Sequence, residues 1–257
     1  MSIQQRKSFN VLVIGEKCDD IFVYGSTTRI SPEAPIPVFD VSHEKKIPGM
    51  AANVKKNLEG LGIIVDMISN EKTIVKKRFV DSRYNQHLLR VDTGLAVDKI
   101  DISKLHALQL QIDAIIISDY DKGFLPNDMI ESVLKILKAF NVPIFVDSKK
   151  RDLSQFKDCI IKVNEKEYND AKHTLPNNSK VIVTLGSAGA MYKDVVYPVK
   201  KVDIFDVVGA GDTFISALAF KYLQTTSIEQ SIIFANICSS FVVTKIGTYA
   251  IKLSDIE

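Results

Sequence analysis

The chain turns from an extended segment into a helix through the stretch DVVGAGDTF, residues 206–214. The apolar patch 202–205 precedes this stretch, and the helical run 215–223 follows it. Small residues at 209–211 let the backbone turn tightly and approach another group closely. A helix that starts at such a turn presents free N–H groups, which bind anions and phosphate above all. The stretch therefore predicts a strand-to-helix turn with an anion site.

Asp212 lies in this same turn. A carboxylate beside an anion-binding turn can accept the proton of a hydroxyl that attacks a γ-phosphate. The alternative is that Asp212 caps the helix and the glycines form a plain turn. For an isolated Gly-x-Gly-Asp that alternative is the more frequent one, but the full string headed by Asp206 is much more specific.

Working outward from this turn, short apolar runs alternate with helical patterns through most of the chain. A helix is expected at 51–61, and Asn127 is placed to cap another helix whose apolar positions follow the 3.6-residue period. This alternation predicts an α/β fold with a mainly parallel sheet and helices on both faces. The expected strands are 11–14, 114–118, 143–147, 160–163 and 181–184.

Two segments break that rhythm. Residues 20–41 mix aromatic, β-branched and proline residues, and residues 78–92 alternate charged and apolar residues. Both are typical of half-exposed strands. We interpret them as a small β element over one end of the main sheet; an ordinary surface hairpin is the alternative.

Composition narrows the class of protein. The 257 residues fit one α/β domain over 1–257, and a net charge of +2 from 33 basic and 31 acidic residues does not indicate a nucleic-acid binder. Cys18, Cys159 and Cys238 are not spaced for a metal clip or a disulfide framework. The first apolar run, 11–14, is too short for a signal peptide or a membrane span. We therefore expect a cytoplasmic protein with no membrane partner.

The stretch 206–214 resembles the C-terminal signature D-T-x-G-A-G-D-x-F of the ribokinase-like carbohydrate kinases. The resemblance implies a three-layer α/β/α sandwich with a small β lid. It also implies that Asp212 is the catalytic base and that Gly209, Ala210 and Gly211 form the anion hole. Asp206 lies where that family often has a loop for a monovalent cation such as K⁺.

Three further segments resemble the nucleotide half of this family, and so imply ATP and Mg²⁺. Asn164-Glu165-Lys166-Glu167 matches its N-x-x-E motif, in which Glu167 would orient the Mg²⁺ hydration shell and Asn164 would face the phosphates. A helix N-terminus is the alternative for these residues. The other two segments are a T-x-G-x-x-G loop with Thr184, Gly186 and Gly189, and an adenine- and cation-site segment with Asn236 and residues 245–248. A hairpin turn, and a helix surface with a C-cap, are their respective alternatives.

The N-terminal half resembles the heptose-7-phosphate kinases within that family. The string ISPEAPIPV, residues 30–38, is the most discriminating piece, and the segments 15–25, 48–54, 86–92 and 118–123 also fit. The resemblance implies phosphoryl transfer from ATP to a hydroxyl of a small sugar phosphate, and a homodimer through the lid. Asp20, Gly49 and Asn53 should face sugar hydroxyls. The candidate cations for the sugar's own phosphate are Lys77, Arg78, Arg83 and Arg90. A solvated strand face is the alternative for each of these four.

The sequence departs from the pattern of these kinases at three places. Met50 replaces the second glycine of a Gly-Gly pair, which is expected to narrow the sugar pocket or to stiffen the lid. Glu16 replaces an aspartate, and the short passage 68–72 stands where a helix and a further strand are usual. The chain ends at Glu257, so we expect no fused adenylyltransferase domain. Two alternative hypotheses therefore stay open: a kinase for another sugar or nucleoside, and a non-catalytic binding protein descended from a kinase.

Overall fold

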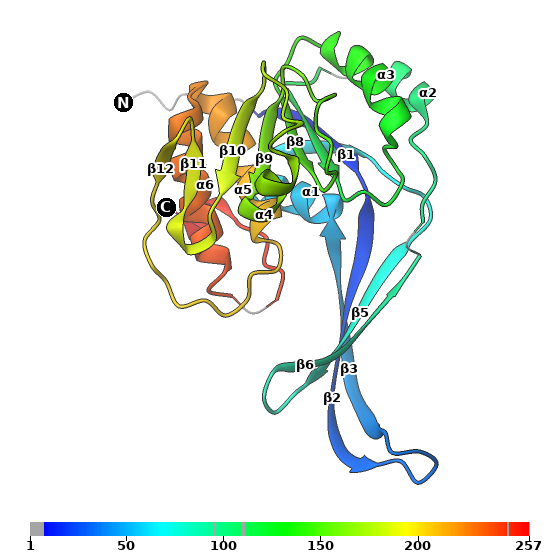
Figure 1. Cartoon of the computed structure of the whole chain (residues 1–257). Helices are drawn as coiled ribbons and strands as arrows, with labels where there is room; N and C mark the ends of the chain where they lie inside the picture. Colours follow the sequence, from blue (N-terminus) through cyan, green and yellow to red (C-terminus); the bar gives the residue numbers. More distant parts are fainter. Residues whose placement is uncertain (1–7, 95, 109–110, 246, 257) are drawn as a thin grey trace.

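The protein folds around two β-sheets, an eight-stranded body sheet and a four-stranded lid sheet that extends away from it (Figure 1). The computed structural model describes residues 8–256 except 95, 109–110 and 246. No helix in this described part of the chain is both long and apolar enough to cross a bilayer. All three cysteines are buried free thiols.

The body sheet has the strand order β12-β11-β10-β9-β8-β7-β1-β4. Its six strands from β10 to β4 run parallel, and β11 and β12 continue antiparallel at one edge. The predicted parallel sheet is therefore confirmed. The strands are β1 Asn10–Gly15, β4 Ile64–Ile68, β7 Ala114–Asp119, β8 Ile144–Ser148, β9 Ile160–Asn164, β10 Lys180–Thr184, β11 Ala190–Tyr192 and β12 Val195–Tyr197.

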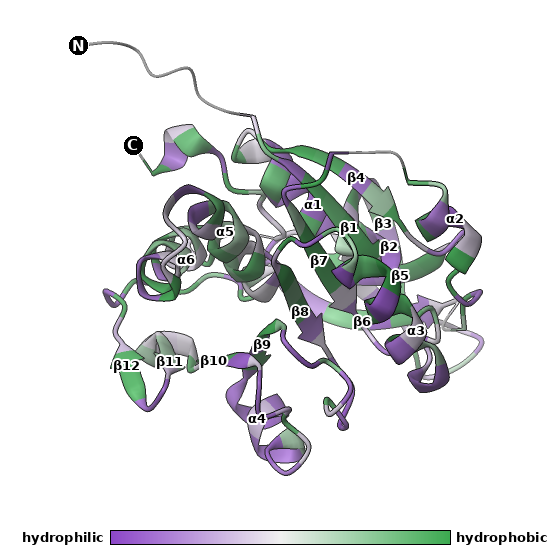
Figure 2. Ribbon diagram, turned by 90° about the horizontal axis from the view of Figure 1, so that it is seen from above, coloured by the Kyte–Doolittle hydropathy of each residue, from purple (hydrophilic) through white to green (hydrophobic). Residues whose placement is uncertain are grey.

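Helices cover both faces of this sheet because its central strands are apolar on both sides. In β1, Val11 and Val13 belong to the core under α1, α5 and α6, whereas Leu12 and Ile14 belong to the core under α2 and α3. Alternate residues of a strand point to opposite faces, so a continuous apolar run supplies two cores at once. Figure 2 shows β1 and β7 as hydrophobic ribbons between the helices. The result is the expected three-layer sandwich.

The helices that the sequence predicts at 51–61, from Asn127 and over 215–223 are found close to those positions as α1 Ala51–Gly60, α3 Asn127–Lys138 and α5 Ala210–Thr225. Helices α4 Glu165–Ala171 and α6 Ile228–Val242 lie where a helix was the alternative interpretation, and α2 Ile102–His106 was not predicted. Short 3₁₀ turns lie at Gly186–Ala188 and Leu253–Asp255. The prediction that Asn127 caps α3 is wrong. Pro126 holds the N-cap position, because its extended backbone (φ −71°, ψ 155°) suits that position, and Asn127 is already the first helical residue.

The lid sheet has the order β3-β2-β5-β6, with strands β2 Lys17–Ile30, β3 Pro37–Met50, β5 Ile74–Asp81 and β6 Gln86–Thr93. Each predicted segment, 20–41 and 78–92, holds parts of two of these strands with a connection between them, and the strands extend beyond the segments to residues 17, 50, 74 and 93. Only Glu16 separates β1 from β2, so the first strand of the lid follows the first strand of the body sheet almost without a break.

The junction of lid and body is tightly built. The passage from β4 to β5 contains only residues 69–73, and the side chain of Asn70 holds it by hydrogen bonds to the backbone of Lys17 and Lys72. Met50 ends β3 with φ +58°, a value that costs a non-glycine residue free energy. Its buried side chain packs with Cys18 and Ile74 at the base of the lid.

Candidate active site

The Asp212 side chain lies at the bottom of a cavity of about 400 Å³, although it is only 6% exposed. Its Oδ2 accepts a hydrogen bond from Asn53 Nδ2 (2.9 Å), and its Oδ1 accepts one from the Tyr120 hydroxyl (2.7 Å). Asp212 does not cap α5, because Gly209 holds the N-cap position with φ +84° and Asp212 is the third helical residue. The carboxylate is therefore free of the capping role and faces the cavity.

Burial raises the pKa of Asp212 above its ordinary value. The hydrogen bonds from Asn53 and Tyr120 act in the opposite direction, and so does the charge of Lys162, whereas the charge of Asp147 adds to the effect of burial. A carboxylate with a raised pKa is a stronger base than an exposed one, which suits the acceptance of a hydroxyl proton.

The start of α5 forms the wall of the cavity beside Asp212. The N–H of Ala210 donates to the carbonyl of Val207 (3.2 Å), so that amide is not free for a ligand. Gly211 and Asp212 are the second and third residues of the helix, and the helix offers their N–H groups no carbonyl partner. The N–H groups of Gly211 and Asp212 are therefore suited to bind an anion. Of the three residues predicted for the anion hole, Gly209 and Gly211 line the cavity and Ala210 does not.

A buried lysine that the sequence analysis missed lies against this turn. A Cβ at Gly211 would stand 2.9 Å from the Lys162 Nζ, which donates to Asp147 Oδ2 at 2.8 Å. Lys149 pairs with the other oxygen of Asp147 (2.8 Å) and with Glu167 Oε1 (2.8 Å). The available signal was a single lysine inside the apolar strand IIKVN. Two ammonium groups thus line the cavity beside the anion turn.

This lysine pair determines the ionisation of Asp147. Burial alone would raise the pKa of Asp147, but the charges of Lys162 and Lys149 outweigh burial and hold the pKa below its ordinary value. Asp147 therefore stays ionised and holds the side chains of both lysines in place by hydrogen bonds.

The N-x-x-E motif forms a capping box at the start of α4. Asn164 accepts the N–H of Glu167, and Glu167 Oε2 accepts the N–H of Asn164, both at 2.8 Å. Asn164 lines the cavity of Asp212, whereas Glu165 and Lys166 are exposed on the helix surface and do not line it. The helix-terminus alternative is thus realised, and it fixes Asn164 and Glu167 at the edge of the cavity.

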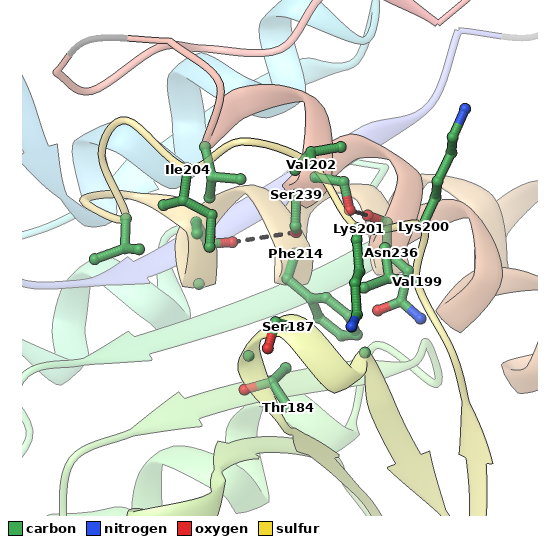
Figure 3. Close-up of a pocket in the computed structure, with 17 residues that line it drawn as sticks. Thr184, Ser187, Val199, Lys200, Lys201, Val202, Ile204, Phe214, Asn236 and Ser239 are labelled. Carbon is green, nitrogen blue, oxygen red and sulfur yellow. Dashed lines mark hydrogen bonds between the residues drawn. The ribbon is translucent and has the colours of Figure 1, made fainter.

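A second cavity, of about 370 Å³, adjoins the first and shares Thr184, Gly186, Val207 and Gly211 with it. Figure 3 shows Phe214 and Asn236 from α5 and α6 facing Thr184 and Ser187 across this hollow. Residues 184–189 connect two antiparallel strands, so the hairpin alternative also holds for them. A largely apolar cavity continuous with an anion turn has the layout of a nucleotide site.

Asp206 does not reach either of these cavities. Its carboxylate accepts the N–H groups of Val208 (2.9 Å) and Gly247 (3.2 Å), and so ties the turn to the segment after α6. The Thr248 Oγ1 nearby is buried without a hydrogen-bond partner among the described residues. Ile246 of the same predicted segment lies outside the described residues.

On the lid side, Asp20 and Arg78 form a buried ion pair (3.2 Å) on the face of the lid that looks toward the body. Lys76 lies on the same face, with its Nζ 5.4 Å from the centre of the Tyr120 ring. A Cβ at Gly49 would come within 2.3 Å of Asp20 Oδ2, so only glycine leaves Asp20 in this position. The Nε of Arg78 is buried without a partner among the described residues.

The structure separates the four predicted lid cations. Arg90 is directly opposite Arg78 on the inward face, where it is exposed and paired with Asp92. Lys77 lies on the outward face and pairs with Glu44 (3.2 Å). Arg83 lies in the turn after β5 and pairs with Asp81 (2.9 Å). Arg78 and Arg90 therefore face the site, and Lys77 and Arg83 do not.

Within the part of the chain that the structure describes, no cluster of three histidine, cysteine, aspartate or glutamate side chains could hold a metal ion directly. A hydrated Mg²⁺ still fits beside Glu167, because such an ion keeps most of its waters and takes its other ligands from phosphates. Both contacts of Glu167, Asn164 and Lys149, line the cavity.

Comparison with known proteins shows the family and the fold of the chain. The pfkB family carbohydrate kinase model matches residues 50–255. The "Bifunctional protein HldE" of Sulfurimonas denitrificans is 31% identical over 312 aligned positions, which cover 98% of this chain and 64% of that protein. The chain thus spans less than two thirds of the length of this relative.

Two solved structures share the fold. Phosphofructokinase-2 from Escherichia coli in complex with potassium superposes with a TM-score of 0.75 at 17% identity, covering 96% of each chain. Ribokinase from Arabidopsis thaliana complexed with ribose and ATP superposes with a TM-score of 0.69 at 15% identity, covering 97% of this chain and 98% of that one.

Proposed function

The chain belongs to the pfkB family of carbohydrate kinases, and from this premise we propose that it transfers the γ-phosphate of ATP to a hydroxyl of a sugar phosphate. The acceptor that we propose is D-glycero-D-manno-heptose 7-phosphate, phosphorylated to the 1,7-bisphosphate. The single observation that carries the proposal is the Asp212 carboxylate, which borders a cavity beside the anion turn of α5 and is held there by Asn53 and Tyr120.

In this reaction Asp212 accepts the proton of the attacking hydroxyl. The N–H groups of Gly211 and Asp212 hold the oxygens of the transferred phosphoryl group, and Lys162 neutralises the negative charge that builds up on them. Mg²⁺, oriented through water by Glu167, would supply further neutralisation of the nucleotide phosphates. The residues of the chain thus act mainly by positioning and by electrostatic stabilisation.

The nucleotide fits the second cavity. Thr184, Gly186 and Gly189 would border its phosphates and sugar, and Asn236 would border the base. For K⁺ we propose the loop between Asp206 and Thr248. The carboxylate of Asp206 and the hydroxyl of Thr248, which has no partner among the residues that the structure describes, are oxygen ligands of the kind that such a hard cation prefers.

The acceptor would lie between Asp212 and the inward face of the lid, with Asp20 and Asn53 toward its hydroxyls. Arg78, Lys76 and Arg90 together would hold its phosphate. The unpartnered Nε of Arg78 supports this, because a buried guanidinium donor without a partner indicates that a ligand supplies one. The relatives named HldE and the resemblance of residues 30–38 to heptose-7-phosphate kinases support the heptose.

A second acceptor within the same reaction class is favoured by Met50. Its buried side chain and its φ of +58° fix the base of the lid where related kinases have a glycine. A lid with less freedom favours a smaller acceptor, such as a simple hexose or a nucleoside.

A panel of acceptors tested with ATP and coupled to ADP release separates these possibilities. We expect turnover of heptose 7-phosphate and a much lower rate with the unphosphorylated heptose, because the lid cations would then have no phosphate to bind. Turnover of a simple hexose without turnover of heptose 7-phosphate would overturn the proposed acceptor. No turnover with any acceptor, together with tight ATP binding, would favour the non-catalytic alternative.

We further propose a homodimer through the lid. Val41, Leu88, Leu89 and Val91 are large apolar side chains on the lid, each more than 40% exposed, and a second lid would cover them. Light scattering should then give twice the monomer mass of 28.7 kDa, and a monomer at micromolar concentration would contradict the proposal. The three free buried thiols support a reducing compartment such as the cytoplasm.

A further inference from the structure

We propose that Tyr120 is a positioning residue for the catalytic base, and that its hydroxyl holds the Asp212 carboxylate in the orientation required for proton transfer. This inference rests on the proposed function, since it assigns a role in the same reaction. Tyr120 directly follows β7 and lines the same cavity as Asp212. Its hydroxyl donates to Asp212 Oδ1 at 2.7 Å, across 92 residues of sequence.

The two oxygens of Asp212 are held by side chains from two different parts of the fold. Asn53 from α1 donates to Oδ2, and Tyr120 donates to Oδ1. Rotation of the carboxylate about its own axis would break both hydrogen bonds. Because each oxygen has a second lone pair, either one can still accept the proton of a substrate hydroxyl. Tyr120 keeps its own proton throughout, and only the substrate proton moves to Asp212.

Tyr120 is suited to act as a permanent donor. Burial, and after it the charge of Asp212, raises the pKa of Tyr120 well above its ordinary value of 10, so the hydroxyl stays protonated at any ordinary pH. The ammonium groups of Lys76 and Lys149 lie 5.4 and 5.7 Å from the centre of its ring. Cation–π attraction at these distances holds the ring between the lid and the nucleotide side of the cavity.

The backbone around Tyr120 is anchored by a fully buried carboxylate, Glu16. Its Oε2 accepts the N–H of Tyr120 (2.8 Å), and its Oε1 accepts the N–H groups of Lys122 (2.9 Å) and Phe124 (3.3 Å). Asp121, within this loop, has φ +55°, a conformation that needs such support. Glu16 is also the single residue between β1 of the body and β2 of the lid. One side chain thus fixes the Tyr120 loop to one of the connections between body and lid.

The charged groups around Asp212 also affect its pKa, and they stay in place when the Tyr120 hydroxyl is removed. Lys162 from β9 favours its ionised form, whereas Asp147 from β8 opposes it, and Cys18 of β2 lies within electrostatic range on the lid side. These groups remain in a Tyr120→Phe variant, which also keeps the ring between Lys76 and Lys149. The variant therefore tests the hydroxyl alone.

The experiment compares the wild type, Tyr120→Phe and a control, Tyr249→Phe, which loses a hydroxyl–carboxylate hydrogen bond to Asp255 outside the site. Two measurements are made: the Asp212 carboxyl titration by ¹³C NMR, assigned with Asp212→Asn, and the pH dependence of kcat with ATP and the acceptor. In Tyr120→Phe we expect the Asp212 titration and the acid limb of kcat to move to higher pH. We also expect kcat to fall roughly 10- to 100-fold, with the KM for ATP unchanged.

An Asp212 titration in Tyr120→Phe that matches the wild type would overturn the inference whatever the activity. A shifted titration with an unchanged kcat would also overturn it, because the hydrogen bond would then have no consequence for the reaction. If the wild type turned over no acceptor at all, the proposed function would fail, and the NMR titration would still decide whether Tyr120 controls the ionisation of Asp212. The control should behave as the wild type in both measurements.

Discussion

Replacement of Lys162 by methionine removes the buried ammonium group beside the anion turn while it keeps most of the side-chain volume. The Lys162 Nζ is 2.9 Å from the position that a Cβ of Gly211 would occupy, and it is 3% exposed. With an effective dielectric constant of about 20, a unit charge about 5 Å from the transferred phosphoryl group contributes about 3 kcal/mol. Only the part that grows in the transition state affects kcat, so we expect a loss on the order of 10²-fold.

The variant should still fold. Asp147 loses one partner but keeps Lys149 at 2.8 Å, so its charge is not left unpaired. The cost in unfolding free energy should therefore stay below the roughly 3–5 kcal/mol that follows when a buried charge loses its only partner. Thermal or urea unfolding checks this before the kinetics are interpreted.

The assay is ADP release at saturating ATP and acceptor, with Lys138→Met as the matched control. Lys138 also pairs with an aspartate (2.8 Å to Asp158), but on the surface of α3, where such a pair contributes little. A folded Lys162→Met protein with a kcat within about threefold of the wild type would refute the electrostatic argument, since the calculated contribution corresponds to a far larger change.

Three further outcomes follow from the site and from the core beneath it. Asp212→Asn should lower kcat by at least about 10²-fold, because the amide keeps the shape of the carboxylate but accepts no proton. The ATP affinity, measured by calorimetry, should stay within about twofold of the wild type. An active Asn variant would contradict the role of Asp212 as the base. Gly49→Ala should displace Asp20, because the new Cβ would lie 2.3 Å from Asp20 Oδ2. The KM for the acceptor should then rise about tenfold while the KM for ATP stays unchanged. Equal changes in both KM values would contradict the placement of the acceptor. Burial raises the pKa of Asp119 from 3.8 to about 6, so the folded protein binds this proton more tightly than the unfolded chain and loses stability as the pH rises from 4 through 6. Asp119→Asn should remove up to about 3 kcal/mol of that loss and flatten the dependence of the urea midpoint on pH in this range; an unchanged slope would contradict the assignment.

The fold could be predicted from the sequence because its signals are local. The apolar runs of β1, β7 and β8 are continuous, so their side chains pack into the cores on both faces of the sheet. The glycine turn at 209–211 marks the start of α5 without reference to any other segment. The periodic patterns of apolar residues in helices and strands depend only on neighbours in the chain, so they can be recognised in the sequence without knowledge of the tertiary structure. The short elements β4, β11, β12 and α2 were not predicted, and the cap of α3 was placed one residue late, because the backbone of a single residue decides where that helix begins.

The site itself was only half visible in the sequence. Asp212 and its turn could be found because they form one continuous string. Tyr120, Lys162 and Asp147 could not be joined to that string, because their contacts connect elements that are distant in the sequence: the end of β7 with α5, and β9 with β8. A single tyrosine or lysine inside an apolar run has the same local pattern whether or not it reaches a cavity.

The sequence by itself determined the α/β class, five of the parallel strands, the anion turn and the carboxylate placed in it. Only the tertiary structure decided which lid cations face the body of the protein, since Lys76 and Arg78 point inward whereas Lys77, between them, points outward. The reason is the two-residue period of a strand: a shift of one position in the pairing register exchanges the two faces, and the register is fixed by contacts between segments that are distant in the chain.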